Sequence, residues 1–277
     1  MRPENLDVLV QWLAERTGFA LGRDQMHLVE SRLFPVARKY ALGDLDTLVG
    51  ELRGGGGRAA ELPVDVVDAM MTSETAFFRD PGAFVELRDR ILPGLVAARG
   101  EGRRLRIWCA GTSTGQEAYS MAMLIRRPEV GLDGWQVDVV ATDVSRQAIE
   151  RARAGSFSHF EAQLGMPVQQ LLRHFRRQQD RWIASDTLRR SITFRELNLL
   201  GDQESLGTFD VVLCRYVLRA CTDGARATIL GKLASRIAAD GVLWLGAGED
   251  IPDGVPGFSP IDGVSGFFAP TRGEAAG

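Results

Sequence analysis

The first 70 residues carry apolar side chains at helical spacing. Before Gly18 they recur three and four positions apart, at Leu6, Leu9, Val10 and Leu13, which places them on one face of a helix. A second amphipathic stretch follows Asp24, and we expect an interruption near Pro35. Two more helices are predicted at 44–53 and 62–71, with the run Gly54–Gly57 between them as a loop. The pattern predicts a small all-α domain over residues 1–70.

After residue 100, short apolar runs alternate with helical segments. Helices are predicted over 112–127, after the N-cap Ser145 as far as Gly155, and over 223–239. This alternation is typical of a parallel sheet with crossover helices. It predicts a doubly wound α/β domain over residues 71–277. The expected strands are 105–111, 136–143, 191–198, 209–217 and 241–248.

Composition and total charge exclude several classes of protein. With 45% hydrophobic and 25% charged residues in 277, the chain is globular in character. Its formal net charge of -3 does not favour a nucleic-acid-binding protein. The sequence lacks an apolar run of the about 18 residues that cross a bilayer, and MRPENLDVLVQWL is not a signal peptide pattern. We therefore expect a cytoplasmic protein without membrane insertion.

The total charge conceals one strongly basic segment. Residues 173–195 hold seven arginines against Asp180 and Asp186, a net charge of +5, so the rest of the chain sums to -8. Such a segment attracts an acidic partner, or it is simply a solvated basic face.

The cysteines and histidines do not form a recognisable metal or disulfide pattern. Cys109, Cys214 and Cys221 are odd in number and have no C-x-x-C spacing, so we interpret them as buried free thiols. His159 and His174 lie near each other in the sequence without matching ligands. We expect structural roles for both and no metal site.

Ligands of open parallel sheets bind beyond the carboxyl ends of the strands. The first strand-to-helix turn is Gly111-Thr112-Ser113-Thr114-Gly115. Its glycines permit close backbone approach, and the helix that follows offers free N–H groups to a polar ligand. The turn is not G-x-G-x-x-G, so the sequence does not favour a nicotinamide dinucleotide.

Two acids near these turns each have two interpretations. Asp143 ends the second strand, where a carboxylate either accepts hydrogen bonds from a ribose diol or stabilises the N-terminus of the next helix. Glu117 either forms a capping box with Thr114 or faces the ammonium group of a ligand. The residues alone leave the choice for Glu117 open.

Six ordered motifs identify a family resemblance. They are TSETAFFRDP at 72–81, WCAGTSTGQEAYSMAM at 108–123, ATD at 141–143, NLL at 198–200, FDVVLCRYV at 209–217 and DGVLWLGAGE at 240–249. In this order they resemble the CheR family, S-adenosylmethionine-dependent methyltransferases that esterify glutamate side chains of bacterial chemoreceptors. The resemblance covers nearly the whole chain. It implies a class I, Rossmann-like methyltransferase sheet, a small N-terminal helical domain and a small β-subdomain inserted at about 156–192.

The resemblance implies a role for each matching position. Glu117 and Asp143 would hold the amino-acid and ribose parts of S-adenosylmethionine, and Asn198 with Leu199 would lie by the adenine. Arg79 would be closest to the transferred methyl and is the expected catalytic residue; otherwise it forms a structural ion pair with an acid such as Asp80. No metal is implied, and the product would be S-adenosylhomocysteine. The full set implied for the cofactor is Ser73, Thr75, Arg79, Glu117, Asp143, Asn198, Leu199, Arg215 and Tyr216.

The sequence departs from the family pattern at three places. Ser73 stands where the family has Asn, and Gln116-Glu117-Ala118 where it has Glu-Glu-Pro. Tyr216 replaces an Asn, and 218–221 replaces an aromatic-rich turn. A ring at 216 either stacks on a neighbour or obstructs the cofactor. One alternative is therefore a scaffold or sensor that binds S-adenosylmethionine or S-adenosylhomocysteine without turnover; another is a CheR-like methyltransferase with a different substrate.

The basic segment falls where the resemblance places the β-subdomain that touches the receptor. We expect Arg176, Arg177 and Arg181 to dock the acidic methylation helices of a chemoreceptor cytoplasmic domain. Family members that tether to a receptor's C-terminal peptide carry a longer, glycine-containing loop here. Residues 175–182 run through without one, so we expect no tethering.

Overall fold

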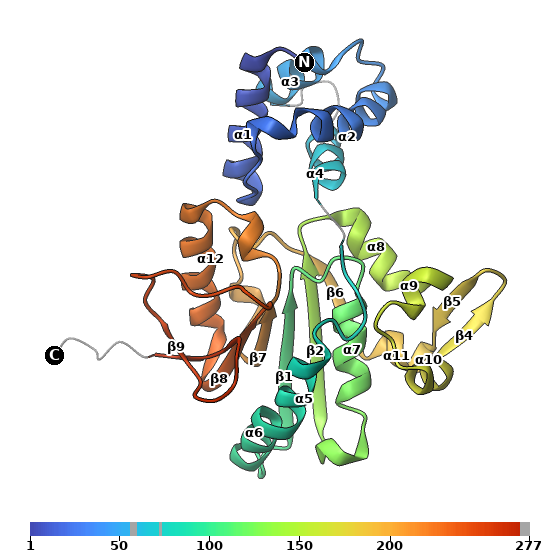
Figure 1. The fold of residues 1–277 in the computed structure, drawn as a ribbon, viewed down its shortest axis with the longest axis vertical. Coiled ribbons are helices and arrows are strands. Elements are labelled where there is room, and N and C mark those ends of the chain that lie inside the picture. The colour runs from blue at the N-terminus through green and yellow to red at the C-terminus, as the bar shows by residue number, and fades with distance from the viewer. Residues whose placement is uncertain (56–59, 72–73, 272–277) are drawn as a thin grey trace.

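The N-terminal helices form a layer of their own above the sheet domain (Figure 1). The computed structural model describes residues 1–55, 60–71 and 74–271. Leucines and valines of all four helices share one core, as their spacing predicts. The helices are α1 (Pro3–Thr17), α2 (Met26–Lys39), α3 (Leu45–Arg53) and α4 (Leu62–Met70), with a short 3₁₀ turn at Arg23–Gln25.

The expected interruption at Pro35 is wrong, because α2 continues through it to Lys39. Leu33 and Val36, on either side of the proline, are buried in the helical core, and this packing holds the helix across the missing hydrogen bond. Gly54 and Gly55 follow α3 in a turn. The rest of the expected glycine loop lies outside the described residues.

The second domain is a mostly parallel, doubly wound sheet, as predicted. Its strand order is β6-β2-β1-β7-β8-β10-β9, and β6, β2, β1, β7 and β8 run parallel. The last two strands are antiparallel additions that the sequence pattern did not reveal. The strands are β1 (Arg104–Ala110), β2 (Gln136–Asp143), β6 (Ile192–Glu196), β7 (Phe209–Cys214), β8 (Ile237–Leu245), β9 (Phe258–Pro260) and β10 (Phe267–Pro270).

Helices cover both faces of this sheet, and one of them, α8, has both of the predicted caps. The Ser145 side chain accepts a hydrogen bond from Ala148 N at the start of α8, and Gly155 ends that helix with a φ of 58°. The remaining elements are α5 (Pro81–Glu86), a π-helical turn (Leu87–Ile91), α6 (Leu92–Ala98), α7 (Gln116–Leu124), α8 (Arg146–Ala154), α12 (Asp223–Arg236) and 3₁₀ turns at Pro128–Val130, Glu204–Leu206 and Leu218–Ala220.

The β-subdomain that the resemblance implies projects from one side of the sheet domain (Figure 1). Its three antiparallel strands have the order β3-β5-β4. Phe157 and Phe175 of this subdomain pack edge-on against Phe77, with ring centroids 5.0 and 5.6 Å away. The elements are β3 (Ser156–Ser158), α9 (His159–Gln163), α10 (Val168–His174), β4 (Phe175–Gln178), β5 (Arg181–Ala184) and α11 (Asp186–Arg190).

The N-terminal helices contact the sheet domain near the end of β2. Asp68 of α4 accepts hydrogen bonds from the Ser145 hydroxyl at 2.6 Å and from Gln147 N at 3.3 Å. The N-terminus of α8 is therefore capped in part by another domain.

A second contact lies beyond the end of β7. Phe19 forms an antiparallel bridge with Cys221. Ala20 N donates to Ala220 O at 2.8 Å, and Thr222 N donates to Gly18 O at 2.9 Å. The helical domain thus reaches two loops at the carboxyl edge of the sheet.

All three cysteines are buried free thiols, as predicted. Burial raises the pKa of Cys221 to about 11 and the pKa values of Cys109 and Cys214 well above their ordinary range. In the part of the chain that the structure describes, no helix is both long enough and apolar enough to cross a bilayer.

We predict that Gly155→Ala destabilises the fold and that Gly231→Ala does not. Gly155 has a φ of 58°, and a Cβ there would lie 2.7 Å from the Tyr119 hydroxyl, so the substitution should cost about 1–3 kcal/mol of unfolding free energy. Gly231 lies within α12 and has open space around it, so alanine there should stabilise by up to about 1 kcal/mol. Urea denaturation measures both, and equal effects would contradict the prediction.

Candidate active site

One cavity lies over the carboxyl ends of the central strands. It holds about 1040 Å³ of space, part of it open to solvent. Ser73 lies outside the described residues. The structure brings the other eight residues implied for the cofactor to this cavity: Thr75, Arg79, Glu117, Asp143, Asn198, Leu199, Arg215 and Tyr216.

The turn after β1 shapes the floor of the cavity. Gly111 has a φ of 80°, and a Cβ there would lie 2.3 Å from a methyl of Val217, so only glycine fits. Gly111 N and Thr112 N both donate to Thr142 O, at 2.8 and 2.9 Å. The hydroxyls of Thr112 and Ser113 are buried and have no hydrogen-bond partner among the described residues. Buried polar groups of this kind are normally satisfied, so the turn has unmet hydrogen-bonding capacity at the wall of the cavity.

Asp143 joins this turn to the next one. Its carboxylate accepts hydrogen bonds from Ser113 N at 2.7 Å and from Ser145 N at 3.0 Å. Burial raises the pKa of Asp143, and the backbone N–H groups partly oppose this. The acid therefore lies at the N-terminus of α8 and also lines the cavity. Its role toward a ribose stays a prediction.

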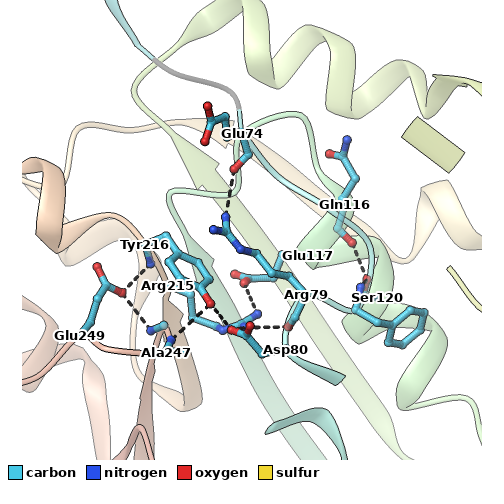
Figure 2. A network of polar contacts seen from close by, with 12 residues as sticks. Glu74, Arg79, Asp80, Gln116, Glu117, Ser120, Arg215, Tyr216, Ala247 and Glu249 are labelled. Atoms are coloured by element: carbon cyan, nitrogen blue, oxygen red, sulfur yellow. Dashed lines mark hydrogen bonds and ion pairs between the residues drawn. The ribbon is translucent and has the colours of Figure 1, made fainter. Parts of the chain in front are cut away.

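A buried arginine joins two carboxylates at the base of the cavity (Figure 2). The Arg215 side chain is only 1% exposed. Its Nη1 donates to Glu117 at 2.9 Å, and its Nη2 donates to Asp80 and to the Arg79 carbonyl, both at 2.7 Å. The guanidinium also lies 4.2 Å from the ring centroid of Trp244.

The contacts of Glu117 exclude one of the two interpretations that the sequence left open. The capping box with Thr114 is wrong, because the Thr114 hydroxyl donates to the side chain of Gln116 at 2.8 Å and α7 begins after Gly115 without a side-chain cap. Glu117 instead points to Arg215 and lines the cavity. Burial raises the pKa of Glu117, and the charge of Arg215 opposes this rise.

Arg79 lies over the ring of Tyr216. Its guanidinium carbon is 3.5 Å from the ring centroid, and its Nη1 donates to the Glu74 carbonyl at 3.2 Å (Figure 2). The alternative of an ion pair between Arg79 and Asp80 is not observed; Asp80 pairs with Arg215 and accepts a hydrogen bond from the Tyr216 hydroxyl. Of the two expectations for the ring, stacking on a neighbour is what the structure shows.

Asn198 reaches the N-terminal domain through its side chain. Its amide donates to the Arg16 carbonyl at the end of α1 and accepts from Leu200 N at 2.9 Å. Leu199 is buried. These two hydrogen bonds leave one N–H and one oxygen lone pair of the amide for a contact with an adenine.

The sequence reasoning missed several residues of the site. Thr17 and Phe19 line the cavity from the helical domain, and only a contact between distant segments brings them there. Asp80 and Glu249 fall within the quoted motifs, but nothing local reveals their partners. Glu249 accepts hydrogen bonds from the backbone N of Tyr216, Gly246 and Arg219.

The structure does not bring the three expected docking arginines to one face. Arg176 and Arg177 are exposed and adjacent on β4, so their side chains lie on opposite faces of the small sheet. Arg181 is half-buried and donates to the hydroxyl and the carbonyl of Ser156, at 2.6 and 2.7 Å. Arg181 thus joins β5 to β3. Its guanidinium is engaged within the small sheet, so we do not count it among the arginines that could dock a receptor.

We predict that Arg215→Met destabilises the fold by about 3–5 kcal/mol, because it leaves the Glu117 carboxylate, which is only 13% exposed, and the partly exposed Asp80 without their cation. The cost should be larger at pH 8 than at pH 5. The pKa of Glu117 is higher in the folded protein than in the unfolded chain. Such a carboxyl lowers the unfolding free energy of the protein as the pH rises from the unfolded pKa through the folded pKa. Loss of Arg215 raises that folded pKa further.

Urea denaturation at the two pH values tests this prediction. Arg219→Met, at an exposed arginine of the same turn, is the control and should change the unfolding free energy by less than about 0.5 kcal/mol. A cost for Arg215→Met that matches this control, or that does not vary with pH, would refute the interpretation.

The comparisons with known proteins agree with this geometry. Residues 73–264 match the family described as "CheR methyltransferase, SAM binding domain". Chemotaxis protein methyltransferase 1 of Pseudomonas aeruginosa is 36% identical over 249 residues, which cover 87% of this chain and 89% of that protein. The chemotaxis protein methyltransferase of Vibrio parahaemolyticus is 34% identical and covers 87% of each chain. Cher2 of Pseudomonas putida is 34% identical, covering 88% of this chain and 89% of its own. The chain therefore belongs to the CheR methyltransferase family and carries its S-adenosylmethionine-binding domain.

Proposed function

We propose that this protein transfers the methyl group of S-adenosylmethionine to glutamate side chains of chemoreceptors, leaving S-adenosylhomocysteine. Relatives named chemotaxis protein methyltransferases at 34–36% identity support the reaction class. The observation that carries the proposal is the arrangement of Arg79 at the cavity. Tyr216 covers one face of its guanidinium, and among the described residues the guanidinium makes a single hydrogen bond, to the Glu74 carbonyl. A guanidinium held in this way can bind a carboxylate with the N–H groups of its edge.

The residues of the cavity fit S-adenosylmethionine. The unpartnered hydroxyls of Thr112 and Ser113 suit the polar groups of its amino-acid part, and Glu117 suits the ammonium. Asp143 can accept from the ribose while it keeps its two backbone hydrogen bonds, because a carboxylate has about four acceptor sites. We assign the adenine to the side of the cavity with Leu199 and Phe19.

The chain's task in the reaction is alignment rather than proton transfer. When bound, S-adenosylmethionine supplies a methyl group on a positively charged sulfur, which an ionised carboxylate accepts without a general base. Arg79 would orient the substrate carboxylate, and Arg215 would hold Glu117 and the Arg79 backbone in place. The scaffold alternative rests on a Tyr216 ring that obstructs the cofactor. The ring instead stacks on Arg79, and this favours a protein that turns over.

The β-subdomain is the surface we assign to substrate docking. Its helices α9 and α10 expose Phe160 (74%), Val168 (69%) and Leu172 (68%), and β4, which follows α10 directly, exposes Arg176 on one face and Arg177 on the other. Exposed apolar side chains with a cation on either face of the adjoining strand suit an amphipathic helix that carries acidic side chains, such as a receptor methylation helix.

This surface adjoins the loop that carries Arg79. Phe77 N donates to the Leu164 carbonyl at 3.2 Å, and Leu164 is itself 45% exposed. A Cβ at Gly165 would lie 2.0 Å from the Phe77 carbonyl. A helix seated on α9 and α10 would therefore lie close to the cavity. Only Gln179 and Asp180 separate β4 from β5, which supports docking without a peptide tether.

Arg79→Ala should lower methyl ester formation about 100-fold and change the dissociation constant for S-adenosylhomocysteine less than threefold. The assay uses purified chemoreceptor cytoplasmic domains and labelled S-adenosylmethionine, with base-labile label as the readout and calorimetry for binding. Arg219→Ala, at an exposed arginine near the same ring, is the matched control. No base-labile label with the wild-type protein, or an Arg79→Ala rate equal to that of the wild type, would refute the proposed function.

Arg176→Glu with Arg177→Glu should raise the KM for the receptor domain about tenfold at low salt, since a repulsive charge replaces an attractive one. Cofactor affinity should not change. Arg181 is kept because it bonds to Ser156. The control reverses Arg53 and Arg236, which lie on other surfaces, with the same change in net charge. Equal KM values for the two double variants would exclude docking through β4.

A further inference from the structure

Tyr216 occupies a backbone conformation that does not suit it. Its φ is 62°, in the left-handed region where a bulky side chain costs about 1–3 kcal/mol. The Glu249 carboxylate holds this conformation, because it accepts a hydrogen bond from Tyr216 N at 2.5 Å (Figure 2). It also accepts from Gly246 N at 2.9 Å and from Arg219 N at 3.1 Å. The turn after β7 is thus built around one acid that satisfies three backbone donors.

The opposite segment leaves space for the ring. A Cβ at Gly246 would lie 2.8 Å from a carboxylate oxygen of Glu249 and 2.9 and 3.0 Å from two ring carbons of Tyr216. The backbone of Gly246 is not in the left-handed region, so these two side chains, and not the backbone, require glycine there. Gly246 therefore makes room for both the ring and the acid that holds its backbone.

Tyr216 is fixed at its backbone and at the tip of its side chain. The backbone N–H donates a hydrogen bond to Glu249. The hydroxyl at the tip of the ring donates to Asp80 and accepts from Ala247 N at 3.3 Å. Asp80 is itself held by Arg215. Because the residue is held at both points, the ring presents a defined face to its neighbour.

That neighbour is Arg79, and the contact keeps most of its donors available. The guanidinium carbon is 3.5 Å from the ring centroid, the shortest such distance among the described residues. Stacking uses the face of the guanidinium, whereas a carboxylate binds the N–H groups at its edge. An ion pair in place of the ring would have used those groups and neutralised the charge.

We propose that Tyr216 is a positioning residue that holds the Arg79 guanidinium by its face and so aims its N–H groups at the substrate carboxylate. The proposal rests on the proposed function. It assigns to Tyr216 a task directed at the substrate through Arg79, in place of the cofactor contact expected from the sequence.

Tyr216→Asn is the informative variant, because Asn tolerates the left-handed backbone and removes the ring. It should lower kcat/KM for the receptor domain about 3- to 30-fold, the range of one cation–π contact, and leave the dissociation constant for S-adenosylhomocysteine within twofold. Tyr216→Phe keeps the ring, so it should retain most of the kcat/KM of the wild-type protein. A loss confined to cofactor affinity would overturn the proposal.

A double-mutant cycle separates positioning from a general structural role. If Tyr216 acts through Arg79, Tyr216→Asn should have no further effect on kcat/KM in an Arg79→Ala background. An effect in that background as large as in the wild type would overturn the proposal. Both measurements use single-turnover assays of the full chain.

A measurement without catalysis tests the stack directly. In a protein labelled with ¹⁵N-arginine, the ring should shift the Arg79 Nε–H proton upfield, and Arg79→Lys identifies this signal by its loss. The shift should persist in Tyr216→Phe and disappear in Tyr216→Asn; an unshifted signal in the wild type would overturn the proposal. Because this readout needs no methyl transfer, an inactive wild type with a shifted signal would refute the proposed function alone.

Discussion

The guanidinium of Arg215 is the interaction on which the site depends. It joins Asp80, which precedes α5, to Glu117 on α7 and to the end of β7. A cation that is 1% exposed loses its hydration, and paired carboxylates must replace that hydration if the charge is to stay in the protein. The same hydrogen bonds fix the Arg79 carbonyl. Three segments from distant parts of the sequence therefore keep one arrangement, and the side chains that face the cavity depend on it.

The backbone around this guanidinium is strained. Among the described residues seven non-glycine positions have positive φ, and four of them lie at or next to the site: Phe78, Asp80, Ser113 and Tyr216. Such conformations persist only where the surroundings over-determine them. Here Ser120 accepts from Phe78 N at 2.9 Å, Asp143 accepts from Ser113 N, and Glu249 accepts from Tyr216 N. Strain and support together point the side chains toward the cavity.

The helical domain is part of this site and not only an attachment to it. Phe19 lines the cavity and bridges to Cys221, and Asp68 binds the hydroxyl that caps α8. Both contacts lie at the carboxyl edge of the sheet (Figure 1). The turns after β2 and β7 line the cavity at this edge. Thr17 and Phe19 of this domain therefore form part of the cavity wall.

The sequence by itself determined the helices of the first domain, the parallel strands, and the positions of Asp143 at a strand end and Glu117 at a helix start. The expected strand 209–217 placed Arg215 inside it, whereas β7 ends at Cys214. Periodicity and turn signals are local, and a parallel sheet places all such ends at one edge. Tertiary structure alone decided the partners. Glu117 pairs with a residue 98 positions away, Asn198 with one 182 positions away, and Arg79 stacks on Tyr216. A short sequence window cannot show which distant group will satisfy a buried charge, because only packing brings the two together and removes the water between them.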